Sequence, residues 1–290
     1  MTGLAIGLAL ASAVLHAVWN FLVKRSGASG ATFTWLFTLP SVLVLAPVAF
    51  YLMAAGHVAL DARAGAFLAG SAVIHTIYFL VLQQGYRVGH LSVVYPIARG
   101  SGPVLAGIAA VVMLKEQPSV GAIIGVLCVA GGAAMLAFET AHADAAVNRA
   151  RASSVRYGLL IGAFIGIYTV WDKYLVADLA MPPVFLEWAL SLSILLLVTP
   201  AAVSNRARLA ATWRAHKVTA VAGAMLGSAS YILFLTALAL APVTRVAPLR
   251  ETSILIGAAL GSRFLAEGDV VRRLAAAGAI ALGVALLAVS

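Results

Sequence analysis

Apolar runs of about twenty residues recur along this chain, from residues 4–23 near its start to residues 271–289 at its end. As a helix, a run of this length crosses the roughly 30 Å hydrocarbon core of a bilayer. Only 10% of the 290 residues are charged, whereas 63% are hydrophobic. A soluble protein has roughly 25% charged residues. The sequence therefore predicts an all-α, polytopic membrane protein.

We expect ten transmembrane helices, at residues 4–23, 32–53, 65–86, 91–114, 119–138, 157–177, 182–202, 218–240, 243–264 and 271–289. No basic residue precedes the first run, which is also longer than the apolar core of a signal peptide, so we expect a retained span. The longest polar stretch, residues 139–156, separates two blocks of five spans. The expected organisation is a first unit over residues 1–140, a linker over 141–156 and a second unit over 157–290.

The two blocks resemble each other under a single shift of 152 residues, which places "HAVWN" at 16–20 on "YTVWD" at 168–172. The same shift pairs further residues, the last after one deletion: Pro96 with Pro248, Arg99 with Glu251, Ser101 with Ser253 and Glu116 with Glu267. Agreement in separate segments at one offset indicates an internal duplication. Because five spans is an odd number, the second copy enters the membrane from the opposite side. The sequence thus predicts two inverted five-helix repeats, an architecture of many transporters.

The basic residues between the spans are distributed unevenly. Thirteen lie in the odd-numbered loops and three in the even-numbered loops. Since cytoplasmic loops of membrane proteins carry the excess of Lys and Arg, we expect cytoplasmic odd loops and extracytoplasmic termini. This distribution also accounts for the net charge of +9, so we expect no nucleic-acid partner.

Charged residues lie well inside two apolar spans: Arg99 in the fourth, and Arg250 with Glu251 in the ninth. By insertion scales a charge at the bilayer centre costs about 2.5–3.5 kcal/mol, so such a residue normally faces a cavity or a partner. Because the repeat gives Arg99 and Glu251 equivalent positions, we expect them to pair across the two halves, at a midplane cavity. In the alternative interpretation, Arg99 extends to the membrane interface.

Two apolar runs are interrupted, by "YPIARGSGP" at 95–103 and by "APLRETS" at 247–253. Proline removes a backbone donor and glycine weakens a helix. We therefore predict discontinuous helices at these positions: Pro96, Gly100, Gly102, Pro103 and Pro248. Matched interruptions in two repeats indicate the binding site of a transporter, and Ser101 would lie in it. For the glycines, the alternative is close packing of helices.

Two aromatic trios form a second set of candidates. In a helix, His16, Trp19 and Asn20 share one face, since they stand at i, i+3 and i+4. The repeat provides an equivalent trio in the second half: Tyr168, Trp171 and Asp172. Inversion places the trios at opposite membrane faces, where they would frame the two ends of one pathway; the alternative is an aromatic belt. Lys173 would reach the interface or pair with an acid.

The third span has polar residues along one helical face: Ser71, His75 and Tyr78, followed by Leu82. His75 can titrate near neutral pH, as proton-coupled carriers require, or can serve as a packing residue. Tyr95 and Tyr231 are candidates to stack on or hydrogen-bond a ligand, with structural roles as the alternative. We expect Glu187 near the interface, and Glu116 and Glu267 in short turns.

Enzyme signatures are missing from the sequence. It has no HExxH, GxSxG or GxxxxGK[ST] motif. The only cysteine, Cys128, lies in an apolar run, so neither a disulfide within the chain nor a cysteine metal site is expected. We expect no catalytic residue, no cofactor and no bound metal.

The segments "HAVWNFLVK" and "YRVGHLSVVYPIARGSGPVLAG", with a glutamate after each fourth span of a repeat, resemble the drug/metabolite transporter superfamily, in particular its bacterial EamA-type members. The second repeat departs from this pattern, with "YTVWDKY" and "APLRET". The resemblance implies a ten-helix secondary carrier of small metabolites in the bacterial inner membrane, with a central cavity. Some proteins of this branch are linked to phosphonate utilisation. Arg99, Arg250 and Lys173 would suit a carboxylate or phosphonate.

The expected function is secondary active transport, with export as the expected direction. The substrate would be a small polar metabolite such as an amino acid or organic anion, moved by alternating access. The expected partners are this substrate, the lipid bilayer and protons as coupling ion, in a monomer or homodimer. The alternatives are a non-transporting membrane sensor or assembly protein and an embedded lipid-modifying enzyme.

Overall fold

The computed structural model describes residues 2–28, 30–88, 91–137, 145–256 and 270–289, and within these ranges it contains helices and no strand. The helices are α1 (Gly3–Ser26), α2 (Gly30–Ala54), α3 (Ala62–Val88), α4 (Leu91–Met113), α5 (Val120–Ala137), α6 (Ala145–Ala177), α7 (Pro183–Val203), α8 (Arg206–Leu240), α9 (Val243–Arg250) and α11 (Val270–Val289). Residues 252–256 are helical as well. The predicted all-α fold is confirmed.

Six of these helices are long and apolar enough to cross a membrane: α1, α2, α3, α6, α7 and α8. Three others contain shorter apolar runs, Ile97–Met113 in α4, Val120–Gly132 in α5 and Ala275–Leu287 in α11. Large apolar side chains on these helices are exposed, such as Leu43 at 62% and Val112 at 61%. The apolar helices, with apolar side chains on their outer surface, indicate a membrane protein.

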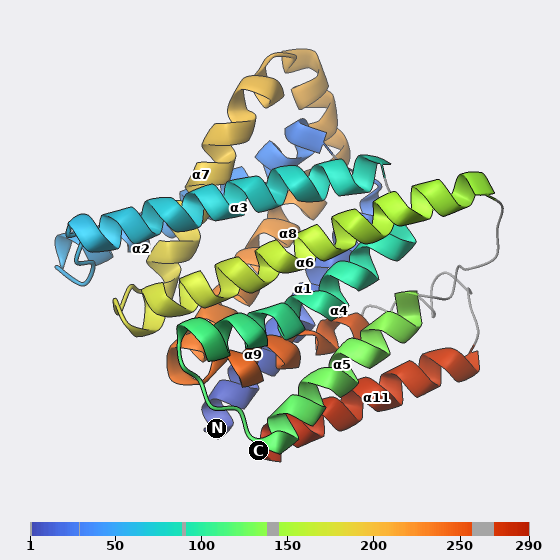
Figure 1. Ribbon diagram of the computed structural model, residues 1–290. Helices are drawn as coiled ribbons and strands as arrows, with labels where there is room; N and C mark the ends of the chain where they lie inside the picture. Colours follow the sequence, from blue (N-terminus) through green and yellow to red (C-terminus); the bar gives the residue numbers. More distant parts are fainter. Residues whose placement is uncertain (1, 29, 89–90, 138–144, 257–269, 290) are drawn as a thin grey trace.

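The helices pack mainly in long pairs. α4 lies along α6, α1 along α8, α5 along α11 and α2 along α7 (Figure 1). The short helix α9 contacts α1, α4, α5 and α8, so it lies inside the bundle. Fully buried leucines of α6, α7, α8 and α9 belong to one core: Leu175, Leu186, Leu235 and Leu249.

The predicted break at residues 100–103 is wrong, because α4 is continuous from Leu91 to Met113. Gly102 packs against α6, where an added Cβ would lie 2.9 Å from Ile165 Cγ2. The hydroxyl of Ser101 donates to the carbonyl of Ile97 at 2.7 Å, within the same helix. Gly100 and Pro103 are buried in this continuous helix, and Pro96 is helical in its backbone, its side chain lying outside the described residues. Close packing against α6 therefore outweighs the local weakness of the proline and glycine sequence.

The predicted break in the second half is present. α9 ends at Arg250, Glu251 forms a turn, and the chain is helical again from residue 252. The backbone N–H of Glu251 donates to the carbonyl of Pro248 at 3.0 Å. The interruption therefore places Arg250 and Glu251 side by side at a turn inside the bundle.

Candidate functional site

The buried ion pair between the two halves is the first element of the site. Nη1 of Arg99, on α4, donates to Oε1 of Glu251 at 3.2 Å. The two side chains are only 11% and 3% exposed. The predicted contact between Arg99 and Glu251 is confirmed.

His16 of α1 and Arg250 of α9 adjoin this pair. Nη2 of Arg99 contacts Nε2 of His16, and Nη2 of Arg250 lies 3.4 Å from Nδ1 of the same ring. The guanidinium carbon of Arg250 lies 4.3 Å from the ring centroid of Phe234 and 5.4 Å from that of Tyr231. Such cation–π contacts stabilise a guanidinium away from water. We call His16, Arg99, Arg250, Glu251 and Ser253, which follows Glu251 by two residues in the chain, the charged cluster.

Three atoms of the charged cluster are buried without a hydrogen-bond partner among the described residues: Nε of Arg250, Oε2 of Glu251 and Oγ of Ser253. The three residues are 7%, 2% and 3% exposed, respectively. A buried polar group without a partner typically costs about 1–3 kcal/mol, more if it is charged. The cluster therefore contains a donor, an acceptor and a hydroxyl that no described residue satisfies.

Asp172 of α6 is the centre of a second polar group. Its side chain is 0% exposed and is contacted by Ser71 Oγ at 2.5 Å, Tyr231 OH at 2.5 Å and His75 Nε2 at 2.8 Å. The ring of Tyr168 lies on that of His75, with centroids 4.5 Å apart. These five residues form the Asp172 cluster. Tyr231 joins it to the charged cluster, because its ring contacts Arg250.

The Asp172 cluster contains serine, histidine and aspartate, but not in the order of a catalytic triad. In a triad the histidine accepts the serine proton and the aspartate orients the histidine. Here the hydroxyl of Ser71 donates to Asp172. The contact that would activate Ser71 as a nucleophile is therefore replaced by one that stabilises the carboxylate.

The two trios are divided between these clusters and the surrounding packing. His16 and Asp172 each belong to a cluster, and Trp19 donates to Nδ1 of His16 at 3.3 Å. In contrast, Nε1 of Trp171 donates to the carbonyl of Phe67 at 2.8 Å, and Nδ2 of Asn20 donates to the carbonyl of His16 in its own helix at 2.7 Å. The location of the trios at two membrane faces stays a prediction.

Other predicted site residues have structural contacts. Nζ of Lys173 donates to the carbonyls of Leu238, at 2.5 Å, and Ala241, at 3.1 Å. It therefore stabilises the C-terminal end of α8. Among the described residues Lys173 forms no ion pair with an acid, although Glu116 and Asp178 are within electrostatic reach. The ring of Tyr78 packs edge-on against Tyr168, with centroids 5.3 Å apart. The side chain of Tyr95 lies outside the described residues.

Glu187 was expected near the interface, but the structure buries it in α7, where it is 9% exposed. Its Oε1 accepts from Ser228 at 2.7 Å and from Ser191 at 3.1 Å. The signal in the sequence was the spacing of Glu187 and Ser191, since residues four apart share a helix face. An acid supported by hydroxyls in this way is suited to the interior of the bundle.

Glu116 has a role that sequence analysis missed. Its Oε1 accepts from the backbone N–H of Val243 at 2.7 Å, and its Oε2 accepts from the N–H of Thr244 at 3.0 Å and the hydroxyl at 2.8 Å. The carboxylate thus caps the N-terminus of α9, where a negative charge is favourable. It also lines a recess of about 550 Å³ together with Lys173 and Asp178. Its repeat counterpart, Glu267, lies outside the described residues.

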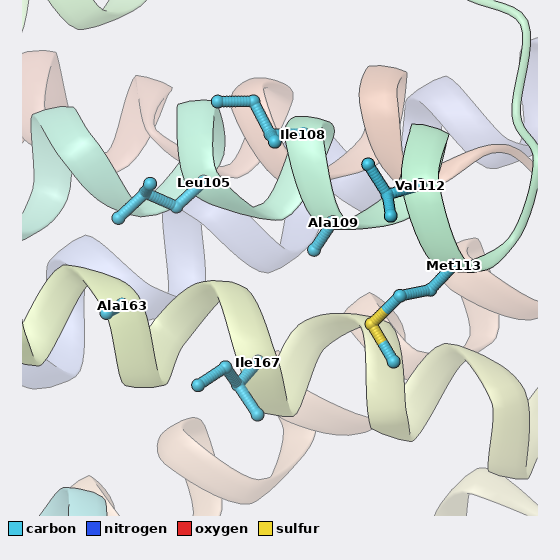
Figure 2. A pocket seen from close by; sticks show the side chains of 7 residues that line it. All are labelled: Leu105, Ile108, Ala109, Val112, Met113, Ala163 and Ile167. Carbon is cyan, nitrogen blue, oxygen red and sulfur yellow. The ribbon is translucent and has the colours of Figure 1, made fainter.

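An apolar recess of about 310 Å³ lies between α4 and α6. Figure 2 shows side chains from both helices around it: Leu105, Ile108, Ala109, Val112, Met113, Ala163 and Ile167. Ile108 and Met113 are 56% and 63% exposed. Because all the lining side chains are apolar, this recess suits a lipid chain and offers nothing to a polar ligand. The clusters inside the bundle are the better candidate site.

Comparisons with known proteins support the fold. No family model and no curated protein matches this chain. A solved structure described as "Crystal structure of protein" is similar, with a TM-score of 0.76 and 14% sequence identity, over 100% of this chain and 98% of that chain. At this identity the similarity shows the fold alone. The resemblance to the drug/metabolite transporter superfamily stays a prediction.

Proposed function

We propose that this protein is a secondary transporter that moves a small polar metabolite across the bacterial inner membrane by alternating access. The observation that carries this proposal is the set of unpartnered atoms on Arg250, Glu251 and Ser253, all buried inside the bundle. A purely structural ion pair is stable only when its remaining donors and acceptors are satisfied as well. Here a ligand would satisfy them.

The packing of the helices supports two inverted repeats that enclose this site. Under the shift of 152 residues, the counterparts of α2, α4 and α5 are α7, α9 and α11, and each helix packs against its own counterpart. Likewise α1 packs on α8 and its counterpart α6 packs on α3. A two-fold axis between the halves requires that each contact between two helices is matched by a contact between their counterparts, as these pairs are. Two such halves can rock about a shared midplane site.

The free atoms of the charged cluster define the chemistry of the substrate. Nε of Arg250 requires an acceptor, such as a carboxylate or carbonyl oxygen, whereas Oε2 of Glu251 requires a donor. The hydroxyl of Ser253 can bond to either. An amino acid or a hydroxylated organic anion carries both kinds of group, in agreement with the substrate class that the family resemblance implies. Neither nucleic acid nor a cofactor is part of this proposal.

A thermal-stability screen of small metabolites on the purified protein tests the site, because a bound ligand stabilises the folded state. Ser253→Ala removes a hydroxyl that has no partner in the free protein. We therefore expect a melting temperature without ligand that is equal to or higher than that of the wild type, because a buried hydroxyl without a partner is costly, and a roughly two- to tenfold loss of affinity. The matched control is the repeat counterpart Ser101, whose hydroxyl is bonded within α4. Ser101→Ala should leave the affinity unchanged.

Liposomes containing the purified protein then decide between the functional classes. Exchange of a labelled metabolite across the bilayer supports a carrier. Binding without exchange supports a sensor and rejects transport, and chemical conversion of lipid supports an embedded enzyme. If no metabolite stabilises the protein, or if Ser253→Ala and Ser101→Ala affect binding equally, the assignment of the charged cluster is wrong.

A further inference from the structure

We propose that His75 and Asp172 form the proton-binding site of this protein, separate from the charged cluster, and that this proton couples transport to a proton gradient. The coupling rests on the transport function proposed above. The site is made by three helices: α6 provides Asp172, α3 provides His75 with Ser71, and α8 provides Tyr231.

The hydrogen bonds of Asp172 allow its partner to change protonation. Ser71 donates to Oδ1 and Tyr231 donates to Oδ2, so each carboxylate oxygen has a neutral donor in addition to His75. When the imidazole is charged, it forms an ion pair with Asp172 at 2.8 Å. When it is neutral, the carboxylate keeps the two hydroxyl donors. Neither protonation state therefore leaves the buried carboxylate unpaired, which is the main cost of burying it.

The balance of charges around this pair favours the binding of one proton. The charged and titratable groups nearby come from several helices. Tyr168 of α6 and Tyr231 of α8 contact the pair, and Glu187 of α7 is within electrostatic reach of His75. Beyond Tyr231 lie the members of the charged cluster: Arg250 and Glu251 of α9, Arg99 of α4 and His16 of α1. The two arginines balance the carboxylates of Asp172 and Glu251. With Glu187 included, the group is electrically neutral both when Glu187 carries a proton and when His75 carries it instead. Because net charge is costly inside a membrane protein, this balance favours a single shared proton.

The proton site and the substrate site are physically connected. The hydroxyl of Tyr231 donates to Asp172, while its ring faces the guanidinium of Arg250 at 5.4 Å. A ligand that neutralises or displaces Arg250 therefore changes the field and the contacts at Asp172. By linkage, protonation of the His75–Asp172 pair must change ligand affinity to the same extent. Coupling of this kind is what a proton-driven carrier requires.

Solid-state NMR on the protein in liposomes tests the proton site with the proton itself as the ligand. The chain has six histidines, and isotope labels in their ring nitrogens distinguish neutral from charged imidazole. The signal of His75 is identified by its loss in His75→Gln. We expect it to change from neutral to charged when the sample is moved from basic to acidic pH. Asp172→Asn should abolish this change, since it removes the negative partner, and Ser71→Ala should preserve it.

If the His75 signal has the same protonation state at both pH values, the proposal is wrong, whether or not the protein transports anything. Should Asp172→Asn fail to fold, the wild-type and His75→Gln spectra decide alone. Coupling is measured with the metabolite that the stability screen identifies. We expect Asp172→Asn to lose accumulation driven by a pH gradient; accumulation equal to that of the wild type would refute the coupling. A screen without a hit overturns the assignment of the charged cluster as the substrate site, while the NMR result stands independently.

Discussion

The carboxylate of Glu116 connects the loop after α4 to the N-terminus of α9, and its replacement by glutamine is a sharp test of the structure. The carboxylate accepts three hydrogen bonds, at 2.7, 3.0 and 2.8 Å. An amide has only one oxygen, so Glu116→Gln can keep the two bonds of Thr244 only by turning its NH₂ group toward the N–H of Val243. One charge-assisted bond is lost and the other two become neutral.

The magnitude follows from these contacts. A hydrogen bond to a charged group contributes about 1.5–3 kcal/mol and a neutral one about 0.5–1.5 kcal/mol. Because Glu116 is partly exposed, water compensates for part of the loss. We therefore expect Glu116→Gln to lower the free energy of unfolding by about 2 kcal/mol, within the range for loss of a helix cap. Reversible unfolding of the protein in mixed micelles of detergent and SDS measures this value.

The matched control is Asp178→Asn, which neutralises an exposed acid in the same recess. It should change the free energy of unfolding by no more than about 0.5 kcal/mol, as most surface substitutions do. Thr244→Val removes one of the bonds to Glu116, so its effect should be non-additive with that of Glu116→Gln. If Glu116→Gln unfolds like the wild type, or if Asp178→Asn is equally destabilising, the capping contact does not stabilise the protein.

Two further substitutions test the packing and the buried pair. Gly132→Ala should destabilise the contact of α5 with α11 by about 1–3 kcal/mol, because its Cβ would lie 2.6 Å from Ile280 Cγ1 and 2.8 Å from a backbone oxygen. Its neighbour has nothing within 4 Å, so Gly131→Ala should be neutral or stabilising in the same unfolding assay; equal effects would contradict the packing. Arg99→Met should cost about 3–5 kcal/mol, since it removes the ion-pair partner of the buried Glu251. The double substitution with Glu251→Gln should recover part of this loss, and a strictly additive result would show that the pair is not coupled.

The sequence alone determined the fold class and the central contact of the candidate site. Apolar runs long enough to span a bilayer leave the backbone few choices other than helices, because each helix satisfies its own hydrogen bonds. A charge within such a run requires a partner, and the shift of 152 residues that aligns the two halves of the sequence gives Arg99 and Glu251 equivalent positions. The pairing of these two residues could therefore be predicted without coordinates, and the structure places them 3.2 Å apart.

Only the tertiary structure decided which residues far apart in the sequence are in contact. The continuity of α4 depends on α6, since Gly102 packs against Ile165, and no local rule for glycine and proline includes that neighbour. Glu116 and Val243, the first residue of the helix that it caps, are separated by 127 residues. The sequence of the loop around Glu116 therefore does not predict the contact. The length and polarity of a helix are determined by consecutive residues, so they can be predicted from the sequence. The helices that pack against it depend on the tertiary structure, so they cannot be predicted from those residues alone.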